Sequence, residues 1–131
     1  MDENVKSPLT TLISDLYFIS ESEYPFTIEE LYEKDFSQIE KNILSRYEPH
    51  SKLIRIETLD FFNRIINNFE ASEDELSQSF AKKYKELYQF IIQACTSSLV
   101  LKCGKIEVGV FIVLEFKNGK FTLLKTISIE T

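Results

Sequence analysis

The sequence is poor in the residues that build loops, metal centres and base-stacking surfaces. Its 131 residues include three glycines, three prolines, two cysteines, one histidine and no tryptophan. The scarcity of glycine and proline argues against a loop-rich or low-complexity chain. The hydrophobic fraction of 44% and the charged fraction of 27% lie in the ordinary globular range. A chain of this length has the size of one domain, so we expect residues 1–131 to fold as a single domain.

No segment has the pattern of a membrane span or of a signal peptide. The longest apolar run, residues 108–114, is far shorter than the roughly 20 residues that cross a bilayer. The first residues, Met1 to Lys6, are polar and lack the basic and apolar regions of a leader. Cys95 and Cys103 have no metal-ligand spacing, and we expect both to be reduced and buried. These features predict a cytoplasmic protein without membrane contact.

Acidic residues outnumber basic ones, 21 to 15, which gives a net charge of −6. This sign disfavours direct contact with nucleic acid, because phosphate backbones require a basic surface. The acids concentrate in two segments. Residues 21–35 hold six acids beside Lys34 alone, and residues 70–75 hold four acids and no base. Two acidic patches would attract a basic protein partner and accelerate its encounter.

Hydrophobic periodicity predicts an α+β domain whose last third is sheet. We expect a first helix with Ser7 as its cap and Pro8 in its first turn, ending near Phe18 or Ile19, followed by a loop over residues 20–26. The other expected elements are a helix after Ser37, a strand over residues 52–57, a helix over residues 59–67 capped by Thr58, a long helix from a Ser72–Glu75 capping box to about Ser97, and strands over residues 99–102, 105–116 and 121–130.

Two local patterns carry further information about the sheet. Thr27-Ile28-Glu29-Glu30 has the form of a capping box and favours a helix from Ile28, while a strand over Phe26 to Leu31 is the alternative. Asn118-Gly119 predicts a hairpin. Residues 108–113 are apolar at both alternating positions, which predicts a strand covered on both faces.

No catalytic or cofactor-binding motif stands out. His50 is the one histidine, and it lies in a polar stretch with no nucleophile motif. Glu21 and Glu23 could be paired as acid and base, but neighbouring glutamates in a serine-rich loop are usually solvated. Gly104 and Gly119 are isolated, so no phosphate-binding loop is formed, and no zinc or calcium motif is present. The residues alone therefore indicate an acidic binding protein without a cofactor, not an enzyme.

Three segments carry the pattern of a known family. The first runs from Leu16 to Phe26 and contains Ser-Glu-Ser-Glu-Tyr-Pro-Phe; the second, Ile56 to Arg64, has a Phe-Phe pair. The third runs from Gly104 through Val108 onward to a final Ile-Ser-Ile-Glu-Thr. In these segments the chain resembles the nuclease A inhibitor family, the inhibitors of sugar-non-specific nucleases.

The resemblance implies a layered α/β/α sandwich, similar to pathogenesis-related-1 proteins, with a mostly antiparallel central sheet and helices on both faces. It implies a monomeric, non-catalytic protein that binds a Mg²⁺-dependent nuclease one to one over its active site. Glu21 is expected to pair with a catalytic arginine of the nuclease. Thr131 is expected to reach the bound Mg²⁺ of the nuclease with its terminal oxygens or hydroxyl.

The sequence departs from the family over residues 27–50 and over residues 67–80, where the known inhibitor has an aspartate and a tryptophan contact. Here Asp74 is the candidate acidic contact and Phe69 the candidate apolar anchor. Glu23 is a further candidate contact beside Glu21. The alternative is an interaction module of the same fold that binds a different protein. A third hypothesis is a small-molecule or hydrolytic site built from Glu21, Glu23 and His50.

Overall fold

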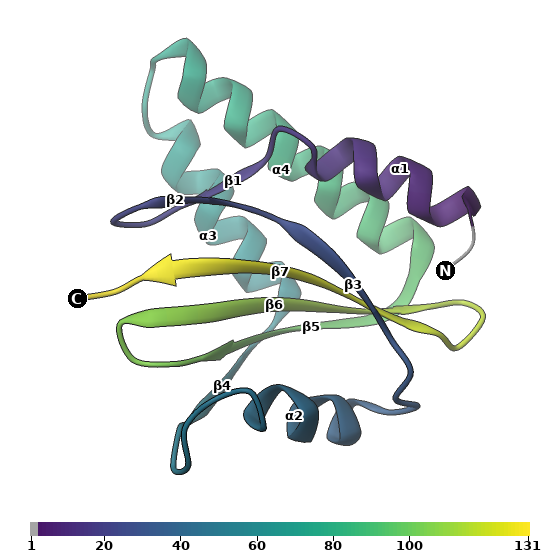
Figure 1. The fold of residues 1–131 in the computed structure, drawn as a ribbon. Helices are drawn as coiled ribbons and strands as arrows, with labels where there is room; N and C mark the ends of the chain where they lie inside the picture. Colours follow the sequence, from purple (N-terminus) through teal and green to yellow (C-terminus); the bar gives the residue numbers. More distant parts are fainter. Residues whose placement is uncertain (1–2) are drawn as a thin grey trace.

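The computed structural model describes residues 3–131, with side chains from Lys6 onward. Its elements are α1 (Glu3–Ile13), β1 (Tyr17–Ile19), β2 (Glu23–Pro25), β3 (Thr27–Leu31), α2 (Phe36–Leu44), β4 (Leu53–Ile56), α3 (Thr58–Glu70), α4 (Glu75–Ala94), β5 (Cys95–Cys103), β6 (Glu107–Phe116) and β7 (Phe121–Ile129) (Figure 1).

Five strands form one antiparallel sheet in the order β3-β7-β6-β5-β4, and β1 and β2 form a separate hairpin. The expected turn at Asn118-Gly119 joins β6 to β7. Gly119 has a φ of 83°, which glycine adopts without steric cost, and the Asn118 side chain accepts a hydrogen bond from the Lys120 N–H at 2.9 Å. The predicted hairpin is confirmed.

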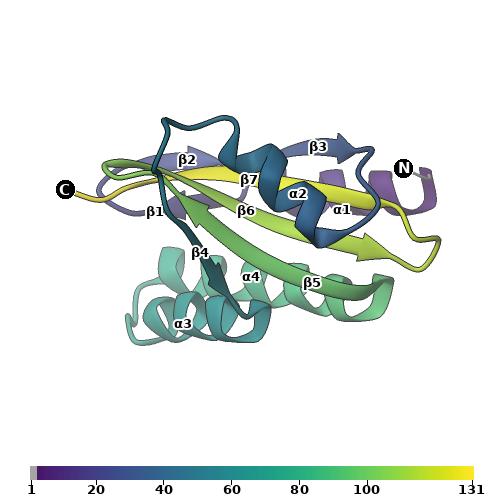
Figure 2. The same ribbon diagram turned by 90° about the horizontal axis from the view of Figure 1, so that it is seen from below.

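Helices lie on both faces of the sheet (Figures 1 and 2). α1, α3 and α4 cover one face over the larger core cluster, in which Phe62 and Tyr84 are completely buried. α2 covers the other face over a smaller cluster with Ile39 and Ile43. β6 is buried on both faces from residue 108 to residue 114, as its sequence predicts. The mixed α+β class with an antiparallel sheet is confirmed, and the likeness to pathogenesis-related-1 proteins stays a prediction.

The N-terminal prediction is wrong at both ends of the first helix. α1 begins at Glu3, so Pro8 lies inside the helix, and it ends at Ile13. Residues 17–19 form β1 and pair with β2, so the expected loop over residues 20–26 is mostly a hairpin. The helical spacing of Leu16 and Tyr17 is outweighed here because pairing with β2 satisfies the backbone of this short segment.

The segment from Thr27 to Leu31 is strand β3, so the predicted helix from Ile28 is wrong and the alternative is confirmed. Each of its five residues pairs with β7, from Thr27 opposite Lys125 to Leu31 opposite Phe121. A ladder of this length outweighs a local capping box. The expected helix after Ser37 is confirmed as α2, which begins at Phe36 because the Asp35 carboxylate accepts the Gln38 N–H at 2.8 Å.

Two predicted helix caps are replaced by neighbouring residues. Thr58 lies inside α3, and its hydroxyl is 2.8 Å from the Ser98 hydroxyl in a partly buried contact. α3 also extends beyond its predicted end, to Glu70. α4 is capped by Asp74 and not by Ser72. β5 begins directly after α4, at Cys95, and so is longer than predicted.

The two cysteines are the first and last residues of β5, roughly 26 Å apart at the rise of a strand. This separation is far beyond the reach of a disulfide, and both thiols are free. Cys103 is buried as expected, whereas Cys95 is only partly buried. Burial raises the pKa of the Cys95 thiol to about 12, so the thiol is unreactive at neutral pH. No helix of the described chain is long and apolar enough to cross a bilayer.

Candidate partner-binding site

The turn between β1 and β2 meets the end of the chain at one end of the sheet (Figure 1). One oxygen of the Glu21 carboxylate accepts the backbone N–H of Thr131, and the other accepts the Thr131 hydroxyl, each at 2.6 Å. The two residues are 110 positions apart in the sequence. The structure thus brings together the two residues that the resemblance singled out.

Ser20 connects this turn to the central sheet. Its hydroxyl oxygen accepts the N–H of Ile129, the last residue of β7, at 2.9 Å. Its own N–H donates to the carbonyl of Ser22 at 2.9 Å, which closes the turn around Glu21. Serine favours such local bonds to the backbone in turns. The position of Glu21 relative to Thr131 therefore depends on the residue just before it.

Glu130 fixes the tail from the other side. Its carboxylate accepts hydrogen bonds from Lys102 Nζ at 2.7 Å and from the Ser128 hydroxyl at 2.9 Å. Its backbone N–H donates to the Ile106 carbonyl at 2.8 Å. The Lys102 ammonium lowers the pKa of the Glu130 carboxyl. Chain ends usually fray unless they are bonded in this way, so Thr131 is held in place by the residue before it.

The Glu21 carboxylate is exposed, and it accepts hydrogen bonds from neutral groups. The hydroxyl of Thr131 lowers its pKa most, and the N–H of Thr131 lowers it further, while Glu130 opposes the effect. Among the described residues no basic side chain forms an ion pair with Glu21. The group is therefore ionised at neutral pH, oriented by neutral donors, and able to accept a guanidinium or another cation.

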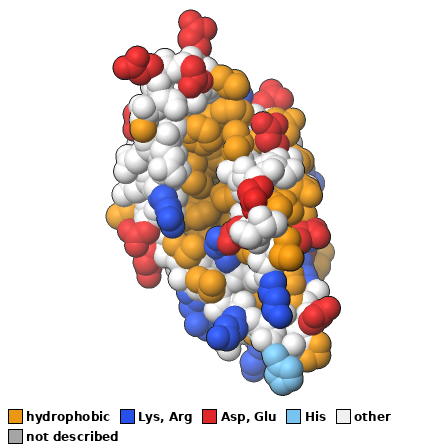
Figure 3. Space-filling model, turned by 90° about the vertical axis from the view of Figure 1, so that its left-hand side faces the viewer, with side chains coloured by type: hydrophobic (Ala, Val, Ile, Leu, Met, Phe, Trp, Pro, Cys, Tyr) orange, Lys and Arg blue, Asp and Glu red, His pale blue; other side chains and the backbone are white. Residues whose placement is uncertain are grey.

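A hollow of about 700 Å³ opens beside this pair (Figure 3). Its border includes Ser20 and Glu130, the neighbours of Glu21 and Thr131. α3 and β1 contribute apolar walls, among them Phe61, Ile65 and Phe18. Figure 3 shows this apolar surface sunk between two ridges that bear acidic side chains. We call this hollow the α3–β1 groove.

The other candidate residues lie around this end of the molecule without joining the pair. Glu23 is exposed in β2, opposite Ile19. Asp74 caps α4, and its carboxylate accepts the Ser77 N–H at 2.8 Å and the Ser77 hydroxyl at 2.9 Å, which lowers its pKa. Ser77 lines the groove, so this cap lies near its border.

Phe69, the candidate apolar anchor, is part of the core. Its ring stacks on Phe80 and on Tyr84, with centroid distances of 5.3 and 5.9 Å. It is partly buried and lines the groove. The ring thus faces the groove as part of its wall and does not project from the surface.

The structure does not bring Glu21, Glu23 and His50 together around a cavity. None of the three lines the α3–β1 groove. His50 lies in the turn between α2 and β4, with a φ of 71°. Among the described side chains, no group of three or more histidine, cysteine, aspartate or glutamate residues has the arrangement of a metal site.

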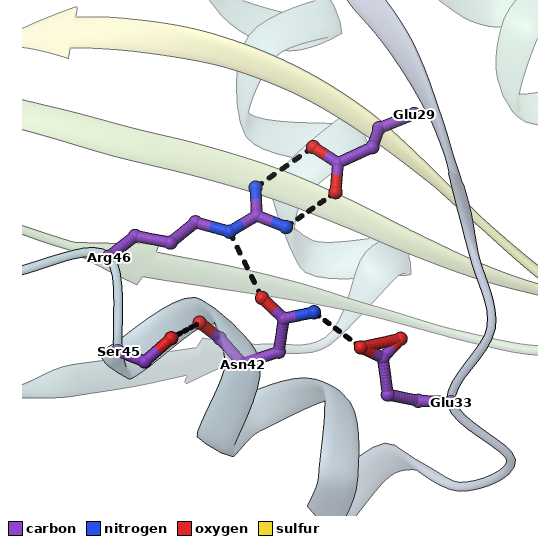
Figure 4. A network of polar contacts seen from close by, with 5 residues as sticks. All are labelled: Glu29, Glu33, Asn42, Ser45 and Arg46. Carbon is purple, nitrogen blue, oxygen red and sulfur yellow. Dashed lines mark hydrogen bonds and ion pairs between the residues drawn. The ribbon is translucent and has the colours of Figure 1, made fainter.

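The acids of residues 21–35 are divided between two surfaces. On the α2 face the Arg46 guanidinium binds both oxygens of Glu29, at 2.9 and 2.5 Å, and also donates to the Asn42 side chain at 3.1 Å (Figure 4). The Asn42 amide binds Glu33 in turn. Glu29 and Glu33 are thus neutralised or hydrogen-bonded within the fold, whereas Glu21 and Glu23 are exposed in the β1–β2 hairpin.

The sequence interpretation missed the residues that support the pair. Ser20 gave no signal beyond its place in a serine-rich turn. Lys102 did give one, because it is a charged residue in the apolar segment Leu99–Cys103. A buried or half-buried charge in a strand needs a partner, and here that partner is Glu130.

Comparison with known proteins supports the resemblance. Residues 3–131 match the family model described as nuclease A inhibitor-like protein. The match includes residues 27–50 and 67–80, where the pattern of the family was not apparent. Among the curated proteins no match was found. Because the family model covers nearly the whole sequence, the chain belongs to the nuclease A inhibitor-like family.

Proposed function

We propose that this protein inhibits a Mg²⁺-dependent, sugar-non-specific nuclease by covering its active site with the β1–β2 turn and Thr131. Family membership supports the inhibitor class. The observation that carries the mechanism is the contact between Glu21 and Thr131. It joins a carboxylate and a threonine in one small exposed surface.

The chemistry of the pair fits the active site of such an enzyme. A nuclease holds a phosphodiester with a hard cation and positive side chains. The Glu21 carboxylate would accept a catalytic arginine in two-pronged geometry. The oxygens of Thr131 would face the Mg²⁺ of the nuclease, since hard cations prefer oxygen ligands. Together these groups would occupy the place of the phosphate and exclude substrate.

The free protein holds this surface ready for binding. Ser20 ties the turn to β7, Glu130 ties the tail to β5, and Thr131 orients Glu21. Groups that are ordered before binding lose less conformational entropy in the complex. Preorganisation therefore favours tight inhibition by a small set of contacts.

The remaining parts of the proposal concern the form of the complex. We expect a one-to-one complex of the nuclease with a monomeric, cytoplasmic inhibitor that has no catalytic activity and does not contact nucleic acid directly. The net charge of −6 supports this interpretation, because it would accelerate approach to a positive active site and repel DNA or RNA. Glu23 and Asp74 would contribute to this attraction from the edge of the interface.

The test is inhibition of a Mg²⁺-dependent, sugar-non-specific nuclease by the wild-type protein and by a variant that lacks Thr131. We expect potent inhibition by the wild type and a large loss in the deletion. Thr131→Ser, which keeps the hydroxyl, is the matched control and should remain potent. Equal potency of the deletion and the wild type would exclude the role of Thr131.

The second candidate function is an interaction module of the same fold with a different partner. Two observations favour it: the chain has no tryptophan, and the Asp74 carboxylate is engaged in capping α4. In this case a correctly folded wild-type protein would inhibit no sugar-non-specific nuclease, and changes at Glu21 or Thr131 would have no effect on nuclease activity.

A further inference from the structure

The α3–β1 groove lies beside the proposed inhibitory pair, and nothing described in the chain fills it. Phe18 and Phe61 stack on one another, with centroids 6.0 Å apart, and both line the groove. Ile19, also in its wall, is 42% exposed. Apolar side chains exposed in a hollow are in unfavourable contact with water, which is typical of an interaction site.

The charges around the groove balance. Two acids and two bases line it: Asp60 and Arg64 on α3, Lys102 on β5, and Glu130 just after β7. Lys102 and Glu130 form an ion pair at 2.7 Å. An anionic ligand such as a nucleotide would meet Asp60 and Glu130 as well as the bases. A cationic ligand would meet Arg64 and Lys102. The groove therefore favours an uncharged apolar group, in contrast to the acidic tip of the β1–β2 hairpin.

The position of the groove identifies the source of that group. Ser20 and Glu130 belong both to its border and to the bonds that hold Glu21 and Thr131. A protein that engages Glu21 and Thr131 would therefore cover the opening. The volume of about 700 Å³ is ample for one large side chain. Buried aromatic anchors in such pockets carry much of the energy of an interface, and this chain has no tryptophan to offer as an anchor itself.

We infer that the α3–β1 groove receives an apolar side chain, aromatic or branched aliphatic, that the nuclease presents next to its active site. This inference rests on the proposed function. The inhibitor would thus provide the pocket, and the nuclease would provide the side chain that fills it. The groove would determine which nucleases bind tightly, while Glu21 and Thr131 would recognise features that every such active site shares.

Two adjacent asparagines on α3 offer a matched test. Both are exposed, but Asn68 lines the groove and Asn67 does not. We expect Asn68→Trp to fill the groove and to weaken binding by about tenfold, measured as the Kd for a sugar-non-specific nuclease that the wild type inhibits. Asn67→Trp should change the Kd by less than about twofold, since most surface substitutions are nearly neutral. Circular dichroism and thermal unfolding would verify that both variants fold.

A second pair of variants tests the wall of the groove without filling it. Ile19→Asn should weaken binding several-fold, whereas Ile92→Asn, at a 57% exposed position on α4 outside the groove, should not. If Asn68→Trp and Ile19→Asn bind as tightly as their controls, the groove inference is wrong while the inhibitor function stands. If the wild type inhibits no such nuclease, the proposed function itself fails.

Light scattering tests whether a second copy of the chain, and not a nuclease, occupies the α3–β1 groove. A wild-type dimer that Asn68→Trp converts to a monomer, with unchanged inhibition, would show that a second copy of the chain fills the groove. That result would overturn the inference. A monomeric wild type whose inhibition is weakened only by the groove variants supports it.

Discussion

Two glutamates of the same acidic segment have opposite environments. The Glu29 carboxylate binds the Arg46 guanidinium with both oxygens on the α2 face (Figure 4). The Glu21 carboxylate also accepts two bonds, but from the neutral N–H and hydroxyl of Thr131. Glu29 is satisfied in both hydrogen bonding and charge, whereas Glu21 is satisfied only in hydrogen bonding. A carboxylate that is oriented but not neutralised is available to a cationic partner. The number of acidic residues in the sequence does not reveal this difference between Glu21 and Glu29.

The largest expected effect is the loss of inhibition when the charge of Glu21 is removed, compared with the same change at Glu29. Glu21→Gln should weaken inhibition on the order of a hundredfold, because the arginine of the nuclease would lose a charged partner in the interface. Glu29→Gln, the matched substitution in the α2-face network, should leave inhibition within about twofold. Measured inhibition constants for the two variants check this. Equal losses would mean that overall negative charge, and not the position of Glu21, drives binding.

An intermediate effect is expected at Ser20, the positioning residue of the turn. Ser20→Ala removes the acceptor of the Ile129 N–H and should weaken inhibition about fivefold, the worth of one typical hydrogen bond. Hydrogen exchange of the Ile129 amide should accelerate in the same variant. Ser45→Ala, which removes a serine bond at the end of α2, is the control and should affect neither measurement. Faster exchange with full inhibition would show that the turn need not be held in place.

A smaller effect is expected on stability, where the substitution at Glu29 should cost more than the substitution at Glu21. Glu29→Gln should lower the free energy of unfolding by about 0.5–1 kcal/mol, since its ion pair is partly exposed. Added salt should reduce this difference by screening the pair. Glu21→Gln should change stability less than Glu29→Gln does, because no ion pair is lost. Denaturant unfolding at low and high salt measures both variants, and the reverse order of stabilities would contradict the comparison.

The smallest expected effect is a shift in the pKa of the Glu21 carboxyl. The pKa of Glu21 lies below the usual value of 4.5, chiefly because the Thr131 hydroxyl donates to it. A depressed pKa stabilises the fold above the ordinary glutamate pKa, and this stabilisation is lost as the pH falls through the lower folded value. Thr131→Val should therefore raise the Glu21 pKa toward 4.5, as measured by NMR titration of its side chain. An unchanged pKa would show that Thr131 does not orient the carboxylate in solution.

Much of the fold could be predicted from local patterns. The long helix α4, the strands β6 and β7 and the turn at Asn118-Gly119 follow from hydrophobic periodicity and from turn chemistry. Two strands were predicted as helix or loop, and both are short. Tyr17–Ile19 and Thr27–Leu31 have helical signals in their sequence, but they are strands because partners distant along the chain pair with them. Local propensity is weaker than a complete ladder of backbone hydrogen bonds.

The candidate site was predicted only in part. The resemblance named Glu21 and Thr131 as separate contacts, and no local pattern could bring them within 2.6 Å of one another. Their meeting depends on the course of β7 beside the β1–β2 hairpin. The α3–β1 groove was not predicted, because its walls come from α3, α4, β1 and the sheet. Phe61 and Phe69 have the sequence signature of core residues, which is correct, and their second role as groove lining arises only from tertiary packing.

The sequence by itself determined the class of fold, the family and the two chemical groups at the proposed interface, because these depend on periodicity and on short motifs. The tertiary structure alone decided which acids are neutralised and which remain free. Glu29 meets a guanidinium because β3 places it on the α2 face beside Arg46, whereas Glu21 meets neutral donors because the β1–β2 turn places it beside Thr131. Charge is a property of the residue, but its availability to a partner depends on the three-dimensional contacts of that residue.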